Sequence, residues 1–418
     1  MQYPAVHKLQ YSEVLTQRYG LIENATGAHV ISPARLAAQL RELARASPTL
    51  LLRALDNPGR VSFEGGVRVG QTMLPAVALR DGRTTFLITF DRATRLPVTI
   101  RTFDDDPIKG DSAFDLVLSD WRAVAGIKMA HTLTYKLNDV QVARVNYANV
   151  VVNPTLGPET FAVPEDLKTA AKPPANGAVP YQSVLRQLYA GKAAVNDDTA
   201  VNAAIGRLKL VELAPDVQQV VGGGQNSLIV AMKDGIAIFD APLGEAQSRW
   251  TINAAKAKYP GKPIKYLILT HHHMDQAAGF RTYVAEGATV VVPKPDKKYF
   301  VDMALRPHAL APDELELKAV SAQVVEVPVQ LTLKDDGEEI RLYRILNPHV
   351  DGLLIAHVVK PNIVWVTDLV SPSPEAAKSP GSRALGLALD RFGIKDATIA
   401  GGNGTSAKQS DLAGALTE

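Results

Sequence analysis

Leucines recur at helical spacing between residues 34 and 55, with arginine and glutamate between them. Apolar residues at intervals of three and four predict amphipathic helical structure. Ser32-Pro33, just before this segment, is a favourable helix start, because serine caps free backbone N–H groups and proline fits the first turn. Pro48 is expected to divide the segment into two helices, and Asn57-Pro58-Gly59 is expected to end the second.

From residue 60 to residue 163 the pattern changes to short β-rich runs separated by turn residues. The predicted strands cover residues 85–90, 97–103, 115–118, 130–137 and 142–152. The turns between them are expected at Asp81-Gly82, Asp104-Asp105-Asp106-Pro107, Lys109-Gly110 and Asn138-Asp139. Strands joined by such short links form an antiparallel sheet, which we expect to curve around a helix or a groove.

The end of this β-rich region resembles the closing strands of lipoprotein-carrier half-barrels, which are periplasmic or envelope-associated proteins. The resemblance rests on residues 120–128, 149–153 and 161–164. A generic antiparallel sheet accounts equally well for the pattern. In either case residues 1–167 are expected to form an N-terminal domain of helix and curved antiparallel sheet.

The stretch that follows is expected to separate two domains. Residues 168–180 are rich in Ala, Lys and Pro, a composition typical of linkers. A short helix is predicted around residues 181–189. We therefore expect residues 168–207 to form a linker with a short helix, and residues 208–418 to form a second domain.

The second domain begins with a hairpin signal. Predicted strands at residues 228–232 and 235–239 are joined by Lys233-Asp234-Gly235, and Asp-Gly favours a tight hairpin turn. A polar, alanine-containing stretch up to Tyr259 predicts a helix. The next apolar run, residues 265–269, predicts a strand that leads directly into a cluster of histidines.

Composition bounds the function without identifying it. The chain has 418 residues, 46% hydrophobic and 21% charged, which fits a globular protein of two domains. Its net charge is +2 with no basic cluster, so nothing favours nucleic acid or an anionic membrane surface as a partner. No apolar run is long enough for a membrane span. With no cysteine, disulfides are excluded and any metal must bind His, carboxylate or amide side chains.

Targeting and assembly are less constrained. The chain begins Met1-Gln2-Tyr3-Pro4, without a hydrophobic targeting segment. We expect either a periplasmic or secreted protein whose signal peptide has been removed, or a cytosolic protein. A small-molecule substrate is expected as the partner, and a homo-oligomer is compatible with the sequence.

The histidine cluster carries the clearest chemistry. It reads Thr270-His271-His272-His273-Met274-Asp275-Gln276 and holds three of the nine histidines of the chain. If the preceding strand continues into it, His271 and His273 point to the same side and can bind one ion. Asp275 can bind a second ion or accept a proton. A solvated histidine-rich turn is the alternative interpretation.

The order of motifs from residue 208 to residue 404 resembles the metallo-β-lactamase fold superfamily. The matching features are Asn226-Ser227 before a strand, Asp240-Ala241-Pro242 at a strand end, the His-x-His-x-Asp cluster, a later histidine, and an aspartate at another strand end. The resemblance implies a four-layer αββα sandwich with a metal site at one edge of its two sheets. The whole chain is then an α+β protein.

The resemblance also implies roles for individual residues. His271 and His273 match the first two ligands of one metal, and His349, between predicted strands at 340–346 and 353–359, matches the third. Three histidines and one open position are typical of catalytic zinc. Asp368 matches the carboxylate that usually bridges two metals, and Asp275 matches a second-metal ligand that orients the water. Asp240 matches a buried acid that braces the histidine loop from the second shell.

Two positions depart from the family pattern. Gln276 stands where a histidine usually follows the motif aspartate, and Asn403 stands where the last strand usually ends in Gly-His-Gly. Both positions serve the second metal, and an amide oxygen is a weaker ligand than imidazole. Our hypothesis is a single metal on His271, His273 and His349, with Asp275 and Asp368 free for proton transfer. The alternative is that Gln276 and Asn403 still bind a metal through their oxygens.

These observations favour a metal-dependent hydrolase. A metal-activated water would attack an ester, lactone, amide or similar bond of a small molecule. One zinc ion is the expected cofactor, and manganese or iron is compatible with the same ligands. The alternative is a non-hydrolytic protein, either a single-metal Lewis-acid isomerase or lyase, or a metal-poor binding module.

Overall fold

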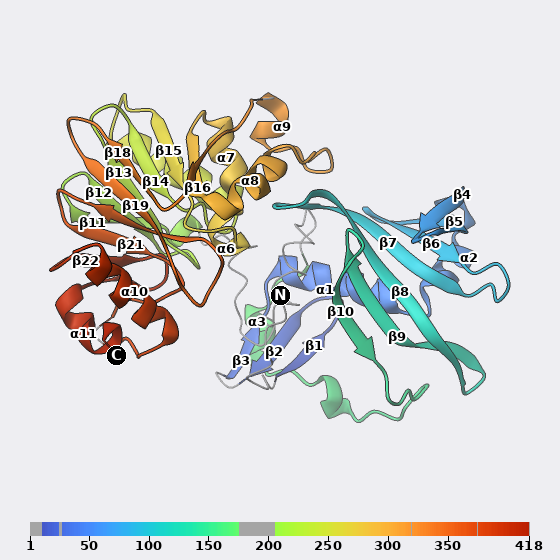
Figure 1. Cartoon of the computed structure of the whole chain (residues 1–418). Coiled ribbons are helices and arrows are strands. Elements are labelled where there is room, and N and C mark those ends of the chain that lie inside the picture. The colour runs from blue at the N-terminus through green and yellow to red at the C-terminus, as the bar shows by residue number, and fades with distance from the viewer. Residues whose placement is uncertain (1–10, 25–26, 175–204, 319, 374, 418) are drawn as a thin grey trace. The chain divides into compact units, whose positions relative to one another are not determined.

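The structure is a computed structural model that describes residues 11–24, 27–174, 205–318, 320–373 and 375–417. It divides into two compact units, Met1–Asp106 with Asp111–Val201, and Pro107–Gly110 with Asn202–Glu418 (Figure 1). The first is β-rich with a few helices, and the second is a mixed α and β unit, so the α+β class is confirmed. Among the described residues, no helix has the length and apolar character that crossing a membrane requires.

The predicted helix pair of the first unit is confirmed. Helix α1 spans Pro33–Ala46, and the Ser32 hydroxyl accepts a hydrogen bond of 3.1 Å from the Arg35 backbone N–H. Helix α2 spans Leu50–Asp56. The break between them falls at Pro48, which cannot donate a backbone hydrogen bond inside a helix.

The first unit also contains two sheets. A three-stranded sheet consists of β1 (Ser12–Leu15), β2 (Gly20–Asn24) and β3 (Gly27–Val30). A seven-stranded sheet has the order β10-β9-β8-β7-β6-β5-β4. Its strands are β4 (Val61–Val69), β5 (Thr72–Asp81), β6 (Thr84–Phe90), β7 (Pro97–Asp106), β8 (Gly110–Val124), β9 (Ile127–Leu137) and β10 (Val140–Asn146). The predicted antiparallel meander is therefore present, with each of these strands beside its neighbour in sequence.

Several details of the sequence prediction for this unit were wrong. Strands β1 to β5 were not predicted, and in β4 a register shift between Phe63 and Gly66 interrupts the alternation on which the prediction depends. Asp104-Asp105-Asp106 belongs to β7 and is not a turn, because buried Asp104 pairs with the Arg41 guanidinium. The strand predicted at 142–152 ends at Asn146.

Most of the predicted linker lies outside the residues that the structure describes. Helix α3 (Glu165–Ala170) covers its first residues, so the chain is helical where the linker was expected to begin. The short helix predicted around residues 181–189 lies outside the described residues.

The second unit has two sheets. The seven-stranded sheet runs in sequence order from β11 to β17, and the six-stranded sheet from β18 to β23. The first contains β11 (Lys209–Ala214), β12 (Val217–Val221), β13 (Ser227–Ala231), β14 (Ile236–Phe239), β15 (Ile264–Ile268), β16 (Thr289–Pro293) and β17 (Gln323–Val327). The second contains β18 (Gln330–Lys334), β19 (Glu339–Ile345), β20 (Leu353–Val358), β21 (Ile363–Val366), β22 (Thr398–Gly401) and β23 (Ser406–Lys408).

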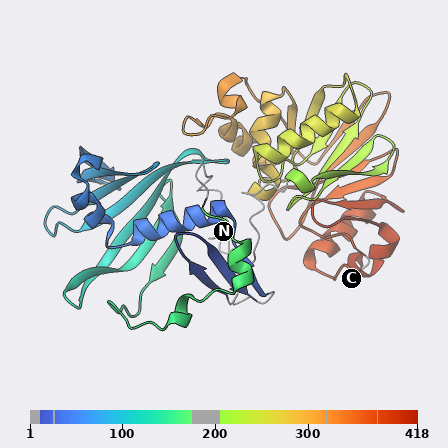
Figure 2. The same cartoon turned by 180° about the vertical axis from the view of Figure 1, so that it is seen from behind.

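Helices cover the outer face of each sheet (Figures 1 and 2). On the seven-stranded sheet lie α5 (Glu245–Lys258), α7 (Phe280–Ala285), α8 (Lys297–Ala304) and α9 (Glu314–Lys318). On the six-stranded sheet lie α10 (Pro380–Arg391) and α11 (Ala413–Leu416). The short α6 (Met274–Ala277) follows the histidine cluster. The four-layer αββα arrangement implied by the family resemblance is confirmed.

Alternation along the central strands explains this layering. In β14, Ile236 and Ile238 pack toward the helices, whereas Ala237 and Phe239 pack toward the other sheet. Successive side chains of a strand point to opposite faces, so a strand that is buried on both faces is apolar throughout. The core between the sheets is therefore continuous, and polar residues that could serve a site are confined to the loops at the strand ends.

Candidate metal centre

The histidine cluster lies in a loop and not in a strand. Strand β15 ends at Ile268, and His273 is the residue before the first turn of α6. Contrary to the sequence prediction, strand alternation therefore does not align His271 and His273. The two rings nevertheless converge. The loop is held instead by hydrogen bonds at Thr270, whose backbone N–H donates to Asp240 Oδ1 at 2.8 Å and whose carbonyl accepts from the Leu354 N–H at 2.9 Å.

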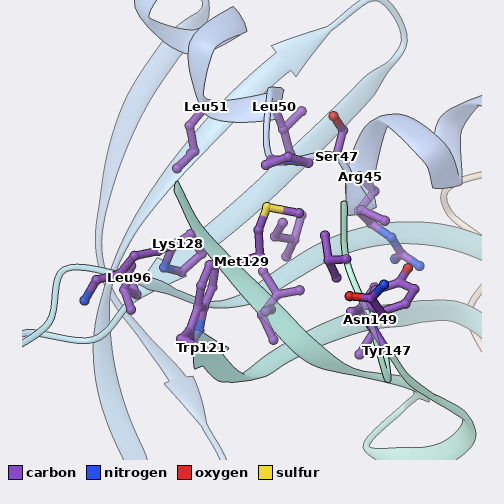
Figure 3. Close-up of a pocket in the computed structure, with 18 residues that line it drawn as sticks. Arg45, Ser47, Leu50, Leu51, Leu96, Trp121, Lys128, Met129, Tyr147 and Asn149 are labelled. Atoms are coloured by element: carbon purple, nitrogen blue, oxygen red, sulfur yellow. The ribbon is translucent and has the colours of Figure 1, made fainter. Parts of the chain in front are cut away.

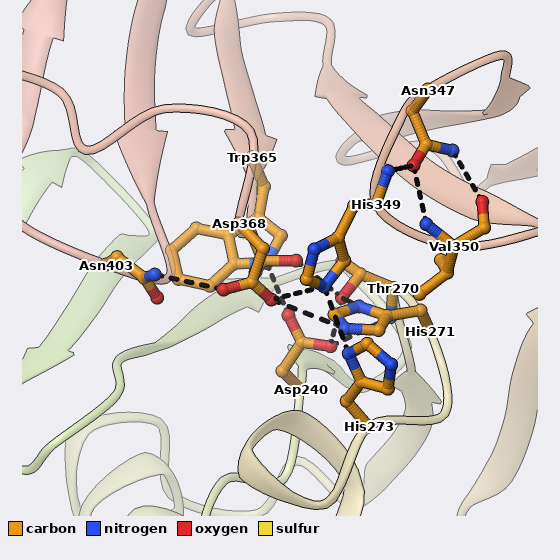
Figure 4. Close-up of polar contacts among 11 residues, drawn as sticks. Asp240, Thr270, His271, His273, Asn347, His349, Val350, Trp365, Asp368 and Asn403 are labelled. Atoms are coloured by element: carbon orange, nitrogen blue, oxygen red, sulfur yellow. Dashed lines mark hydrogen bonds and ion pairs between the residues drawn. The ribbon is translucent and has the colours of Figure 1, made fainter. Parts of the chain in front are cut away.

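Three imidazole rings from two distant parts of the chain meet at this loop (Figure 4). The ring centroids of His271 and His273 are 4.7 Å apart, those of His271 and His349 5.0 Å, and those of His273 and His349 4.7 Å. His273 Nδ1 lies 3.0 Å from His349 Nε2. One ligand atom from each ring lies within 4.8 Å of the others, so the three histidines could hold a metal ion.

Asn347 fixes the loop that carries His349. Its Oδ1 accepts hydrogen bonds from the backbone N–H groups of His349 and Val350, at 2.8 and 2.9 Å (Figure 4). Its Nδ2 donates to the Val350 carbonyl at 3.0 Å. The sequence prediction assigned Asn347 no role, yet the Asn-Pro pair ahead of the histidine is the signal of such an Asn-centred turn.

Asp240 anchors the opposite side of the centre. It is fully buried and adopts a positive φ of 58°, a left-handed conformation that is uncommon for residues other than glycine, although aspartate and asparagine adopt it more often than most. Its Oδ2 accepts from Trp365 Nε1 at 2.8 Å, and its Oδ1 accepts from the Thr270 hydroxyl at 2.8 Å. Burial raises the pKa of Asp240 to about 7, and these donors oppose that shift.

This network sets the proton position on His271. Because the Thr270 hydroxyl donates to Asp240, its oxygen is left to accept from His271 Nδ1, 3.2 Å away. The proton of the neutral ring then sits on Nδ1, and Nε2 presents a lone pair to the centre. Neither Thr270 nor Trp365 was identified from the sequence.

Asp368 faces the three rings from the other sheet. It follows β21, is 11% exposed in its side chain, and adopts a positive φ of 58°. Its Oδ2 lies 3.3 Å from His271 Nε2 and 3.6 Å from His349 Nε2. Its Oδ1 accepts from Asn403 Nδ2 at 3.0 Å, so Asn403 presents its amide nitrogen to the carboxylate (Figure 4).

Asp275 and Gln276 belong to α6, beside the same carboxylate. Burial raises the pKa of Asp368, and the negative charge of Asp275 raises it further. Gln276 is fully buried and lies close enough to Asp368 to lower the pKa of that carboxyl group. Neither Oε1 nor Nε2 of Gln276, however, makes a hydrogen bond of ordinary geometry to a described residue. All the residues predicted for the centre therefore lie around it.

The chemistry of these side chains fits a cation. His271 Nε2 and Asp368 Oδ2 are buried, have no hydrogen-bond partner among the described residues, and face each other at 3.3 Å. Two electron-rich atoms in this position repel unless a proton or a cation lies between them. A tetrahedral ion with bonds of about 2.0–2.1 Å separates its ligand atoms by about 3.3 Å, and the 3.0 Å between His273 Nδ1 and His349 Nε2 is close to this spacing.

The protonation of the rings also suits a metal. Burial lowers the pKa of His271 well below its ordinary value, and the neighbouring histidines lower it further. Burial lowers the pKa of His273 to about 4, with His349 as the next contributor. Neutral imidazole is the form that binds a metal, so neither ring needs to lose a proton near neutral pH.

His272 does not take part in the trio. Its Nδ1 lies 2.8 Å from Oδ1 of the buried Asp296, and its ring centroid lies 6.5 Å from that of His271. The middle histidine of the cluster is therefore not one of the three rings that could hold a metal ion. This makes His272 a natural control for substitutions of the other two.

A cavity of about 480 Å³ opens beside the centre, next to His349, Asp368 and Asn403. The rest of its wall comes from the loop between β21 and α10, which contributes Ser371, Ser373, Glu375, Ser379 and the aliphatic residues between them. Its size lies within the range of small-molecule sites. The hydroxyl groups and the carboxylate make it a predominantly polar site.

Comparison with known proteins identifies the same region. Residues 220–389 match the family model of the metallo-beta-lactamase superfamily. Similar solved structures include a metallo-beta-lactamase from Pontibacter korlensis (17% identity, covering 50% of this chain and 97% of that one, TM-score 0.39). They also include a metallo-beta-lactamase from Hirschia baltica (17% identity, 50% and 96%, TM-score 0.39). A third is the mono-zinc form of FIM-1 from Pseudomonas aeruginosa (14% identity, 50% and 93%, TM-score 0.39). No curated protein matches the chain.

Proposed function

Because residues 220–389 match the family model of the metallo-beta-lactamase superfamily, we propose that this unit is a metal-dependent hydrolase that uses a single zinc ion. The observation that carries the proposal is the convergence of His271, His273 and His349, whose ligand atoms lie within 4.8 Å of one another. The buried, unpartnered His271 Nε2 supports it further. Zinc with three histidine ligands lowers the pKa of water to about 7 and polarises a carbonyl oxygen.

The protein side chains would divide the remaining work. His271 Nε2, His273 Nδ1 and His349 Nε2 would hold the ion, and Asp240 would keep His271 in the required tautomer through Thr270. We assign to Asp275 the removal of a proton from the attacking water. Asp368, held at Oδ1 by Asn403 and kept at a raised pKa by burial, would give its proton to the leaving group, and proton exchange with solvent would then restore both carboxyl groups.

The size and polar lining of the cavity favour a small, polar substrate. Serine hydroxyls and Glu375 around it can bind hydroxyl, amide or amine groups of a substrate. We therefore propose an ester, lactone or amide as the scissile bond. Metal analysis of the purified full chain, followed by assays on an ester, a lactone and an amide, tests the proposal. One tightly held ion and metal-dependent turnover are expected, whereas no bound metal and no turnover after zinc, manganese or iron is added would refute it.

Asp240→Asn is expected to weaken zinc binding by about 10–100-fold, the usual effect of losing a partner that orients a metal ligand. Asparagine keeps one acceptor oxygen but turns an N–H group toward either Trp365 Nε1 or Thr270, both of which donate to Asp240. Competition with a chromophoric chelator measures the affinity. Asp296→Asn is the matched control, since Asp296 is a buried acid that pairs with His272. Equal zinc affinity in the two variants would contradict the role given to Asp240.

The chelator-treated protein is expected to lose stability as the pH falls from about 6.5 toward 4. Burial lowers the pKa of His273 to about 4, below the ordinary histidine value of about 6.5. Between these values the unfolded chain binds a proton that the folded chain does not, so acidification favours unfolding. His273→Gln removes this group and should reduce the pH dependence of the thermal unfolding temperature. An unchanged pH dependence would show that His273 is not kept neutral by the fold.

A further inference from the structure

The loop between β21 and α10 forms one wall of the cavity beside the histidine centre. The start of this loop is fixed, because Leu369 is buried in the core that α10 covers and the Pro372 carbonyl accepts a hydrogen bond of 3.2 Å from the Thr405 hydroxyl. Its middle forms a turn in which the Ala376 N–H donates to the Ser373 carbonyl at 3.0 Å. The turn therefore places the side chains that it carries in the wall of the cavity.

Glu375 is the charged side chain of this turn. It lines the cavity, is exposed, and makes no hydrogen bond or ion pair with a described residue. The described lining contains a second carboxylate, that of Asp368, but no lysine or arginine, and Lys378 of the same loop is not part of it. A molecule that enters this cavity therefore meets a carboxylate that has no cationic partner in the wall.

Two sources of positive charge lie near this wall, and neither changes its sign. An ion at the histidine centre would be balanced first by Asp275 and Asp368, which lie beside that centre. The N-terminus of α10 contributes only about half a unit charge. The Ser382 N–H in its first turn already donates to the Ser379 hydroxyl at 3.0 Å. The charge of Glu375 is therefore available to a bound molecule.

Another cavity of the chain has the opposite character (Figure 3). This cavity of about 440 Å³ in the first unit is lined by apolar residues such as Leu51 and Trp121. Its charged lining consists of Arg45 and Lys128, without aspartate or glutamate among the described residues. Because like charges repel, a small cation is disfavoured there. Binding of a small cation to the chain should therefore report on the cavity that contains Glu375.

We propose that the substrate carries an aliphatic ammonium group, which Glu375 binds while the scissile carbonyl lies at the histidine centre. The inference rests on the proposed hydrolase and names the class of its substrate. A carboxylate accepts strong, charge-assisted hydrogen bonds from an ammonium group, and the hydroxyls of Ser371 and Ser373 in the same wall can accept its remaining N–H groups. The ammonium group keeps its proton throughout, and hydrolysis consumes one water for each bond that it cleaves.

A pair of esters of equal size tests this preference on the zinc-loaded full chain. In β-alanine methyl ester an ammonium group replaces the terminal methyl group of methyl butanoate. The ratio of their kcat/KM values should fall about fivefold in Glu375→Gln, as expected for the loss of one partly exposed ion pair. The intrinsic reactivity of the two esters cancels in this comparison, because both variants hydrolyse the same pair. If the chain cleaves a lactone or an amide instead, the same replacement is made in that substrate.

Asp390→Asn is the matched control for Glu375→Gln. It removes one negative charge from an exposed position on α10 that does not line this cavity, so the ratio should stay unchanged. Glu375→Lys reverses the charge of the wall and should lower the ratio further than Glu375→Gln does. Equal ratios in the unmodified chain and in Glu375→Gln would overturn the inference and leave the hydrolase proposal intact.

Binding of butylammonium chloride, measured by saturation-transfer NMR on the zinc-loaded full chain, gives a readout that needs no turnover. Glu375→Gln should weaken this binding about fivefold, and Asp390→Asn should not change it. Binding that depends on Glu375 without turnover of any ester, lactone or amide would support the ammonium site and refute the hydrolase. Binding that Glu375→Gln leaves unchanged would overturn the ammonium site, whatever the turnover.

Discussion

Replacing His273 by alanine is expected to abolish both metal binding and hydrolysis. The Nδ1 atom of His273 lies 3.0 Å from His349 Nε2, so its ring supplies one of three nitrogens that would share the ion. Removing a ligand should cost more than the roughly 10–100-fold loss caused by removing a residue that only orients one. Metal content of the purified protein and turnover of the same ester, lactone and amide panel give the measurement.

His272→Gln is the matched control for this experiment. It changes the adjacent histidine of the same loop, which pairs with Asp296, and glutamine can still donate a hydrogen bond to that carboxylate. Metal content and turnover should stay close to those of the unmodified chain. If His273→Ala retained the ion, or if His272→Gln lost it to the same extent, the assignment of the ligands would be wrong.

The double substitution Gln276→His with Asn403→His is expected to raise the metal content from one ion per chain toward two. Both side chains lie beside Asp368, and both are neutral amides at positions where the superfamily pattern has histidine. Imidazole is a stronger ligand for zinc than an amide oxygen. Asp275 and Asp368 would complete the second site, so the new histidines would add to carboxylates that are already present.

The single substitutions show whether the two positions act together. Each alone supplies one imidazole and should leave the metal content near one ion per chain, whereas the pair should bind the second ion with measurable affinity. A metal content near two before any substitution would contradict the hypothesis, because Gln276 and Asn403 would then already hold an ion. A double variant that folds and still binds one ion would also contradict it.

The second unit could be predicted well because its signals are local. Strands such as β14 and β20 are apolar along their whole length, since they are buried on both faces, and Asp-Gly at residues 234–235 marks the hairpin between β13 and β14. The candidate ligands follow these strands at the positions that the superfamily motif specifies. Of the residues that hold them, Asp240 was predicted from the superfamily motif, whereas Asn347, Thr270 and Trp365 were not, because they act through contacts that only the folded loops create.

The first unit was harder to predict for a physical reason. Its sheet has one face toward a helix pair and the other largely exposed, and β4 contains two glycines and a register shift, so alternation is weak there. A buried ion pair also made one turn prediction wrong. Asp104 was predicted to lie in a turn, but it belongs to β7 and its carboxylate pairs with Arg41 inside the fold. Charge in a sequence indicates a surface turn only when no partner is available inside the protein.

Anomalous diffraction at the zinc edge, from crystals of the full chain grown with zinc, tests the central claim most directly. The account predicts one strong peak about 2.0–2.1 Å from the ring nitrogens of His271, His273 and His349, the usual zinc–nitrogen distance. The absence of a peak among these rings, or a second peak of similar strength bound by Asp275, Gln276 and Asn403, would contradict it.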